Sequence, residues 1–229
     1  MPGFGVGVGV GLEKPLLAGG IESILGDTGR VYLDYNDIAV ADAADVTTWT
    51  NRFTGYGDLT EATNPPSHDE SIGGVYFDGV SGILSVASIP DMSEYLDVWI
   101  LIKSTSVQNL KAAWHLLDGN SRFLTGQGSR WTQAGTSETY VEIETISTTS
   151  WQWVRCTWGG GSGEGVVNDT VVDTSPRGIA VIDNLAIGGG YGTAGSREMW
   201  AKHFILSSGA TSAQRAAVDA WIDAEKDAA

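Results

Sequence analysis

The sequence has little cysteine, few basic residues and no long apolar run. Cys156 is the single cysteine, so no internal disulfide can form, and a disulfide-stapled secreted module is excluded. The 13 Lys and Arg against 28 Asp and Glu give a net charge of −15, which offers no electrostatic footprint for DNA or RNA. No apolar run approaches the roughly 18–20 residues that span a bilayer. We therefore expect neither a nucleic-acid nor a membrane partner.

Glycine, tryptophan and short apolar runs are what the chain has in their place. It holds 31 glycines and nine tryptophans among 229 residues, and 42% of its residues are hydrophobic. That share is enough for one sizeable core. The length suits a single all-β sandwich or barrel as well as two small domains.

The first twelve residues alternate glycine with apolar residues. Such a period of two would place the apolar set on one side of an extended strand, namely Phe4, Val6, Val8, Val10 and Leu12. There is no basic segment before them, so they do not read as a secretory signal. We predict that residues 1–30 form an anchor arm and connector, whose apolar residues bind a partner chain. The alternative is a low-complexity leader.

From residue 31 onward, strand-length runs rich in β-branched and aromatic residues alternate with turn residues. These runs are 74–79, 82–86, 97–103, 140–146, 151–158, 165–172, 184–188 and 200–206. Without helical patterns between them, they predict one all-β sandwich or jelly-roll domain over 31–229. In the run 151–158 both alternating faces are apolar, so we expect this strand to be covered on both sides.

One helix is predicted at the end of the chain, over 211–227. Thr211 and Gln214 have the spacing of a capping box. Val218, Trp221 and Ile222 then fall on one face at helical spacing, which predicts packing against the sandwich.

Three segments in this order resemble a known family. They carry WTNR at 49–52 and GVYFDG at 74–79, WQWVRCTW at 151–158, and LAIGG at 185–189 followed by the closing strand and helix. The chain is similar to the laminin-G-like, concanavalin A-like jelly rolls of phage structural proteins. The fold that this implies is a jelly-roll sandwich with a C-terminal helix and an extended N-terminal arm.

The resemblance also implies a function. We expect a non-enzymatic virion protein, a capsid decoration, fibre or tail component on the outside of the head or tail. It would attach to other virion proteins through its arm and form a homo-oligomer, with a trimer favoured. The alternative is a glycan-binding module for adsorption to host surface glycan, and a third hypothesis is a polysaccharide-degrading enzyme.

The chemistry-bearing residues favour binding over catalysis. Glu142 and Glu144 would share one strand face, as paired glycosidase carboxylates do, but Ile146 stands where a third acid belongs. We therefore predict no catalytic residues. For glycan binding, the aromatic candidates are Trp131, Tyr191 and Trp200.

No cofactor is expected, with calcium as the one candidate. Asp34, Asn36 and Asp37 supply the hard oxygen ligands that Ca²⁺ prefers, although their spacing is not that of an EF-hand. The alternative, which we favour, is a solvated acidic loop.

Overall fold

The computed structural model describes residues 20–61, 63–89, 95–106, 111–116, 122–127, 130–133, 141–145, 147–159, 163–173, 184–188 and 197–229. Of these, residues 111, 112, 115, 116, 122–127, 130–133, 141–145, 172 and 173 are described in their backbone only. The predicted arm residues Phe4, Val6, Val8, Val10 and Leu12 lie outside the described residues, and so does Tyr191.

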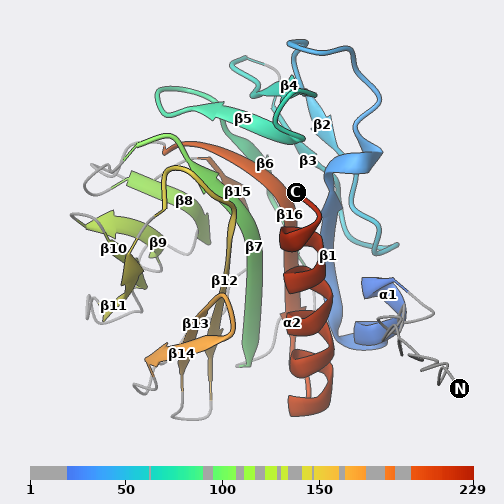
Figure 1. The fold of residues 1–229 in the computed structure, drawn as a ribbon. Helices are drawn as coiled ribbons and strands as arrows, with labels where there is room; N and C mark the ends of the chain where they lie inside the picture. Colours follow the sequence, from blue (N-terminus) through green and yellow to red (C-terminus); the bar gives the residue numbers. More distant parts are fainter. Residues whose placement is uncertain are drawn as a thin grey trace, which may run out of the picture.

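Two antiparallel sheets form a sandwich (Figure 1). The first, sheet A, has the order β14 (Thr170–Asp173), β13 (Glu164–Val167), β12 (Gln152–Trp158), β7 (Leu96–Ser104), β16 (Glu198–Ser208), β5 (Gly74–Asp78) and β4 (Ser67–Asp69), with β1 (Gly29–Asp34) paired to β16. The second, sheet B, has the order β11 (Val141–Thr145), β10 (Arg130–Gln133), β9 (Arg122–Gln127), β8 (Lys111–Leu116), β15 (Leu185–Ile187), β6 (Leu84–Val86), β3 (Leu59–Thr60) and β2 (Thr48–Trp49). Hairpin pairs of consecutive strands alternate with pairs that are distant in sequence, such as β7 with β16 and β8 with β15, as jelly-roll connections require.

The main core lies between the two sheets. Alternate residues of β7 and β12, such as Val98, Ile100 and Val154, point inward and are at most 1% exposed. Trp114 from sheet B meets Trp158 and Phe204 from sheet A in edge-to-face contacts, with ring centroids 5.8 and 5.9 Å apart.

A second core covers the outer face of sheet A. There the helices α1 (Ile21–Leu25) and α2 (Ser212–Asp227), with the short turn η1 (Gly26–Thr28), pack on the sheet, while η2 (Tyr35–Asp37) follows β1. Trp99, Trp153 and Ile205 project from the strands and are fully buried with Val218 and Ile222 of α2. Sheet A is thus covered on both faces, as predicted for the run 151–158, in which every residue of β12 is buried.

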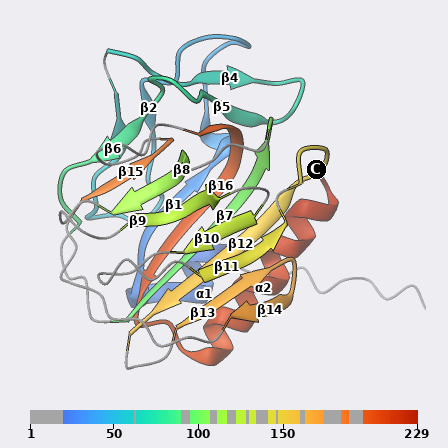
Figure 2. The same cartoon turned by 90° about the vertical axis from the view of Figure 1, so that its left-hand side faces the viewer.

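Figures 1 and 2 show α2 lying along the outer face of sheet A, with its C-terminal end towards β4 and β5. The predicted capping box is present: Gln214 N–H donates to the Thr211 hydroxyl at 3.2 Å, and the Gln214 side chain accepts from Thr211 N–H at 2.9 Å. The helix prediction is confirmed.

Two local predictions change. The run 165–172, read as one strand, is two strands joined by a tight turn, because Asn168 and Asp169 adopt positive φ angles of 46° and 67°. Residues 20–30, assigned to the connector, are packed into the fold: Ile21 and Leu25 of α1 are at most 1% exposed.

Among the described residues, no helix is both long and apolar enough to cross a membrane.

Candidate functional site

Helix α2 is held down by polar contacts as well as by apolar packing. Asp219 accepts a hydrogen bond from Trp99 Nε1 at 2.7 Å, and Asp223 accepts one from Trp153 Nε1 at 3.2 Å. These bonds give the two buried indole N–H groups partners and fix the helix in register on sheet A. A cleft lies at each end of the helix, and we name them the C-end cleft and the N-end cleft.

The C-end cleft has a volume of about 420 Å³. It is formed where the β4–β5 turn, the end of β7, the loop before β12 and the end of α2 meet. Its lining residues are Ser71, Ile72, Lys103, Thr149, Ser150, Trp151, Lys226 and Ala229. The surface is therefore one of hydroxyls, lysines and apolar atoms, with no Asp, Glu or His side chain among these residues.

An aromatic group borders this cleft. Lys103 Nζ lies 5.9 Å from the centroid of the Trp200 ring, and Trp200 lies 5.2 Å from Tyr76, with the two rings tilted by 39°. Both rings are half-buried. Gly74 makes the packing behind them close: a Cβ there would meet Trp151 Cη2 at 3.1 Å and Trp200 Cβ at 3.2 Å.

Asp69 fixes the orientation of Trp200. Its Oδ2 accepts the Trp200 Nε1–H bond at 2.8 Å, and its Oδ1 accepts from the Ser71 hydroxyl at 2.7 Å and from Ile72 N–H at 3.1 Å. Burial by itself would raise the pKa of Asp69, but these hydrogen bonds outweigh it and hold the pKa below its usual value. The carboxylate stays charged at neutral pH and holds the ring in place.

The two lysines of the C-end cleft differ. Lys226 Nζ lies 2.7 Å from Asp223 Oδ1 and 3.7 Å from Asp227 Oδ1. Burial would lower the pKa of Lys226, but its bond to Asp223 and the nearby carboxylates raise it instead. Within the described part of the chain, no carboxylate pairs with Lys103.

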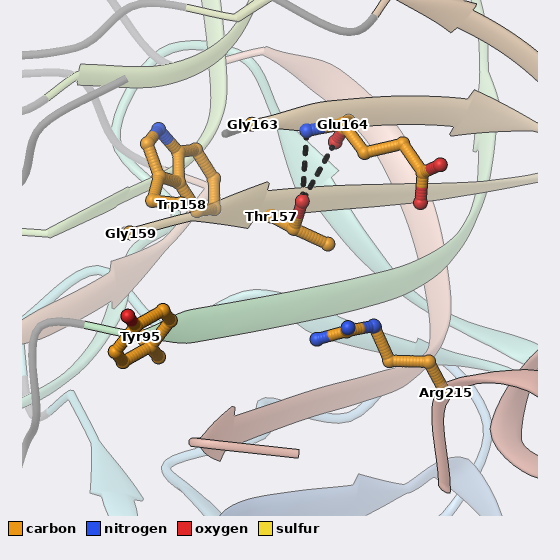
Figure 3. A pocket seen from close by; sticks show the side chains of 7 residues that line it. All are labelled: Tyr95, Thr157, Trp158, Gly159, Gly163, Glu164 and Arg215. Atoms are coloured by element: carbon orange, nitrogen blue, oxygen red, sulfur yellow. Dashed lines mark hydrogen bonds between the residues drawn. The ribbon is translucent and has the colours of Figure 1, made fainter. Parts of the chain in front are cut away.

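The N-end cleft has a volume of about 270 Å³ and is lined by Tyr95, Thr157, Trp158, Gly159, Gly163, Glu164 and Arg215. Figure 3 shows Thr157 joined to the Glu164 backbone: Glu164 N–H donates to Thr157 Oγ1 at 2.8 Å, and the same hydroxyl donates to Glu164 O at 3.4 Å. Tyr95 stands at its edge and is 52% exposed.

The charged residues around the N-end cleft form ion pairs with one another. Arg155, 7% exposed in its side chain, pairs with Glu164 and with Asp219, the latter at 2.6 Å. Arg215 Nη1 donates to Ala210 O at 2.9 Å and lies 3.5 Å from Asp97 Oδ2. This network ties β7, β12, β13 and the start of α2 together.

Asp97 is the one strongly perturbed acid in this network. It is 1% exposed, and burial raises its pKa to about 6, against the opposing effect of Arg215 and Arg155. A raised pKa in a cleft is a common mark of a catalytic acid. Asp97, however, is not among the residues that line the cleft, so the structure gives it no contact with a ligand.

The candidate calcium residues converge on an arginine. Asp34 Oδ1 accepts from the N–H and the amide of Asn36, each at 2.9 Å, and Asp34 Oδ2 lies 2.9 Å from Arg52. Arg52 also bonds both oxygens of Asp37, at 2.6 and 2.8 Å. In the described ranges, no group of three or more His, Cys, Asp or Glu residues is arranged to hold a metal. Calcium binding stays a prediction.

One of the predicted glycan-binding aromatics lies beside the C-end cleft. Trp200 borders the C-end cleft through Lys103. Trp131 lies in β10 of sheet B, where only the backbone is described, and it pairs there with Glu144. Sequence reasoning missed Lys103 and Trp151, and the hydroxyls of residues 149–150, which only the fold brings together.

No family model matches the chain, and no curated protein matches it. Solved structures do. Trypanosoma rangeli sialidase in complex with sialic acid matches with a TM-score of 0.60 and 13% identity, over 86% of this chain and 33% of that one. The botulinum neurotoxin serotype D binding domain matches with a TM-score of 0.60 and 11% identity, over 88% of this chain and 52% of that one.

A third match is a single domain. Domain 4 of AbnA, a GH43 extracellular arabinanase from Geobacillus stearothermophilus, in complex with arabinotriose, has a TM-score of 0.59 and 13% identity. The match covers 84% of this chain and 98% of that domain, whereas this chain spans about a third of the sialidase and half of the toxin domain. At these identities the likeness concerns the fold. The predicted jelly-roll β-sandwich with a C-terminal helix is confirmed.

Proposed function

We propose that this chain is a non-catalytic carbohydrate-binding module that holds a glycan in the C-end cleft. The observation that carries the proposal is the lining of that cleft, which combines the apolar side chains of Ile72 and Trp151 with the hydroxyl groups of Ser71, Thr149 and Ser150. Ligand sites commonly combine an apolar and aromatic surface with a few placed polar groups. A sugar ring offers both halves of this match, since its C–H face packs on apolar atoms and its hydroxyls exchange hydrogen bonds.

The absence of acids from this lining supports binding without hydrolysis. Most glycoside hydrolases need a pair of carboxyl groups that flank the scissile bond. The C-end cleft has none among its lining side chains, and the acids of the N-end cleft are engaged by Arg155 or buried behind Arg215. Glu142 and Glu144 lie in β11 of the other sheet.

The structural neighbours lend further support. Two of the three were solved with a sugar, sialic acid in one and arabinotriose in the other, and the third is named a binding domain. Domain 4 of the arabinanase is the most direct parallel, because nearly the whole of that domain superposes on this chain.

The test is glycan binding by a blocked variant and a matched control. Thr149→Trp places a large side chain at the exposed rim of the cleft, while Thr148→Trp makes the same change at the neighbouring exposed residue, which does not line it. On a glycan array, and by calorimetry on the strongest hit, we expect Thr149→Trp to weaken binding at least about tenfold, equal to about 1.4 kcal/mol. Thr148→Trp should bind like wild type.

Two results would overturn the proposal. One is a wild-type chain that binds nothing on an array of neutral and acidic glycans. The other is a glycan that Thr149→Trp binds as tightly as wild type does, which would place the site elsewhere.

The virion role stays a prediction from the sequence. The arm that would attach the chain to other virion proteins lies outside the described residues, and none of the structures named above is a phage protein. Glycan binding is compatible with it, because a fibre or decoration protein can also adsorb to host polysaccharide.

A further inference from the structure

Lysine is scarce in this chain, and its placement is uneven. The sequence has five lysines against a net charge of −15, and two of the five, Lys103 and Lys226, line the C-end cleft. In so acidic a chain, Asp and Glu are the charged residues expected to line a cleft. The residues that line the C-end cleft include neither. The charged side chains among its lining residues are Lys103 and Lys226, and Lys226 is paired with Asp223 and Asp227.

Lys103 lies in β7 near the C-terminal end of α2, beyond the residues of this strand that share a core with the helix. Along β7 the residues that face outward are Asp97, Trp99, Leu101 and Lys103. The first three are at most 1% exposed, with Trp99 and Leu101 in the core that includes α2, whereas Lys103 is half-buried and lines the C-end cleft. Lysine commonly buries its aliphatic stem and keeps its ammonium group at the surface, which agrees with the half-burial of Lys103.

Nothing within the described part of the chain neutralises Lys103. Its Nζ lies over the ring of Trp200, 5.9 Å from the ring centroid, near the roughly 6 Å limit of a cation–π interaction. Lys226, by contrast, is held by Asp223 and Asp227. An ammonium group with three donors and no carboxylate is therefore available in the cleft beside an aromatic ring.

We infer that the glycan bound in the C-end cleft is acidic, and that its carboxylate or sulfate group pairs with Lys103. This inference rests on the proposed function, since it names the class of sugar that the same cleft takes. The ring of the sugar would lie over the apolar side chains of the cleft, with its anionic group at Lys103 Nζ. Charge complementarity supplies selectivity, because the rest of a surface with a net charge of −15 repels an anion.

The test compares acidic glycans with their neutral forms. An array of neutral, carboxylated and sulfated glycans identifies the strongest acidic ligand, and calorimetry then measures it beside its carboxyl-reduced or desulfated counterpart. Which counterpart loses affinity tells a carboxylate from a sulfate. The variant is Lys103→Gln. Lys202→Gln is its control, since it removes the same charge at a residue outside the cleft whose ion pair with Glu225 is long, at 3.9 Å.

We expect wild type to prefer the acidic form by about two- to fivefold, the range of a partly exposed ion pair. Lys103→Gln should lose that preference while it still binds the neutral form, and Lys202→Gln should keep it. Lys226→Gln should have the smaller effect of the two cleft lysines. The preference should also weaken as salt rises, because exposed charges are screened.

The outcomes separate this inference from the proposed function. Equal binding of acidic and neutral forms by wild type, or an acidic preference that survives in Lys103→Gln, overturns the inference and leaves glycan binding intact. Binding of no glycan of any class overturns both. Urea unfolding of each variant shows that the comparison is between folded proteins.

Discussion

The two clefts at the ends of α2 differ in what their charges do. At the N-end, Arg155 and Arg215 are matched by Glu164, Asp219 and Asp97, so the charged groups bind one another and hold the helix to the sheet. At the C-end, Lys103 has an aromatic neighbour and no paired carboxylate within the described residues, and hydroxyl-bearing residues line the same cleft. A network that satisfies itself stabilises the fold, whereas an unmatched charge beside apolar side chains is suited to a ligand.

The largest expected effect is at the N-end. Arg155→Met leaves Asp219 and Glu164 without their cation in a partly buried position, which costs about 3–5 kcal/mol for a broken buried pair. Urea unfolding measures this. Arg52→Met, at a guanidinium that is 31% exposed, is the matched control and should cost clearly less.

Glycan affinity measured on folded Arg155→Met should equal that of wild type, because this residue lies at the other end of the helix from the binding cleft. Equal stability losses in Arg155→Met and Arg52→Met would show that the N-end network is no more than a set of surface ion pairs.

The next effect is the pH dependence of stability, which should have opposite signs for Asp97 at the N-end and Asp69 at the C-end. Burial raises the pKa of Asp97 to about 6, above its ordinary 3.8. Between about pH 4 and 6 the folded chain therefore keeps a proton that the unfolded chain has lost, and stability falls as pH rises through this window, by about 2–3 kcal/mol from this group. Asp97→Asn should remove that fall, as measured by urea midpoints from pH 4 to 7.

Asp69 near the C-end cleft supplies the contrast. Its pKa is lowered, so its contribution to stability is present above the usual aspartate range and is lost as pH falls below it. Asp69→Asn should therefore lower the free energy of unfolding at neutral pH. In acid, where the wild-type carboxyl group is protonated, the variant and wild type should differ less. The same sign for both variants would contradict the assignment of the two environments.

The smallest expected effect concerns the close packing behind the C-end cleft. In Gly74→Ala the new Cβ presses on the Trp151 ring at 3.1 Å and on Trp200 Cβ at 3.2 Å, so both residues must shift by a few tenths of an ångström. We expect a stability loss of about 1 kcal/mol, at the low end of overpacking, with glycan affinity weakened about threefold. Gly82→Ala is the control, because its Cβ meets ordinary contacts at 3.6 Å.

Glycan affinity from calorimetry and stability from urea midpoints, measured on both variants, test this prediction. An affinity unchanged in Gly74→Ala despite a loss of stability would mean that the ring positions do not matter to the ligand.

Several elements were predictable because their signals are local. The capping box at Thr211 and the apolar face of α2 need only a few consecutive residues, and the two-sided burial of β12 follows from its alternation of apolar groups. The split of 165–172 into two strands was missed, although Asn168 and Asp169 are the residue types that accept the positive φ of a tight turn.

The C-end cleft could not be predicted, because its parts are separated along the chain. Ile72, Lys103, Trp151 and Lys226 come from four distant segments. Of the aromatic residues proposed for glycan binding, Trp200 proved to border this cleft, yet its sequence context is an ordinary strand. The partners that hold it, Asp69 and Lys103, are likewise set by strand pairing rather than by proximity in sequence.

The sequence by itself determined the class of fold, since residue periodicity and turn chemistry act over a few neighbours and predict strands, turns and one capped helix. It also determined the acidic balance that makes a lysine-lined cleft unusual. Only the tertiary structure decided which charges meet. Strand order and the position where α2 ends enclose Arg155 and Asp97 in one place and leave Lys103 open in another, and the surroundings of a charge decide whether it stabilises the fold or is available to a ligand.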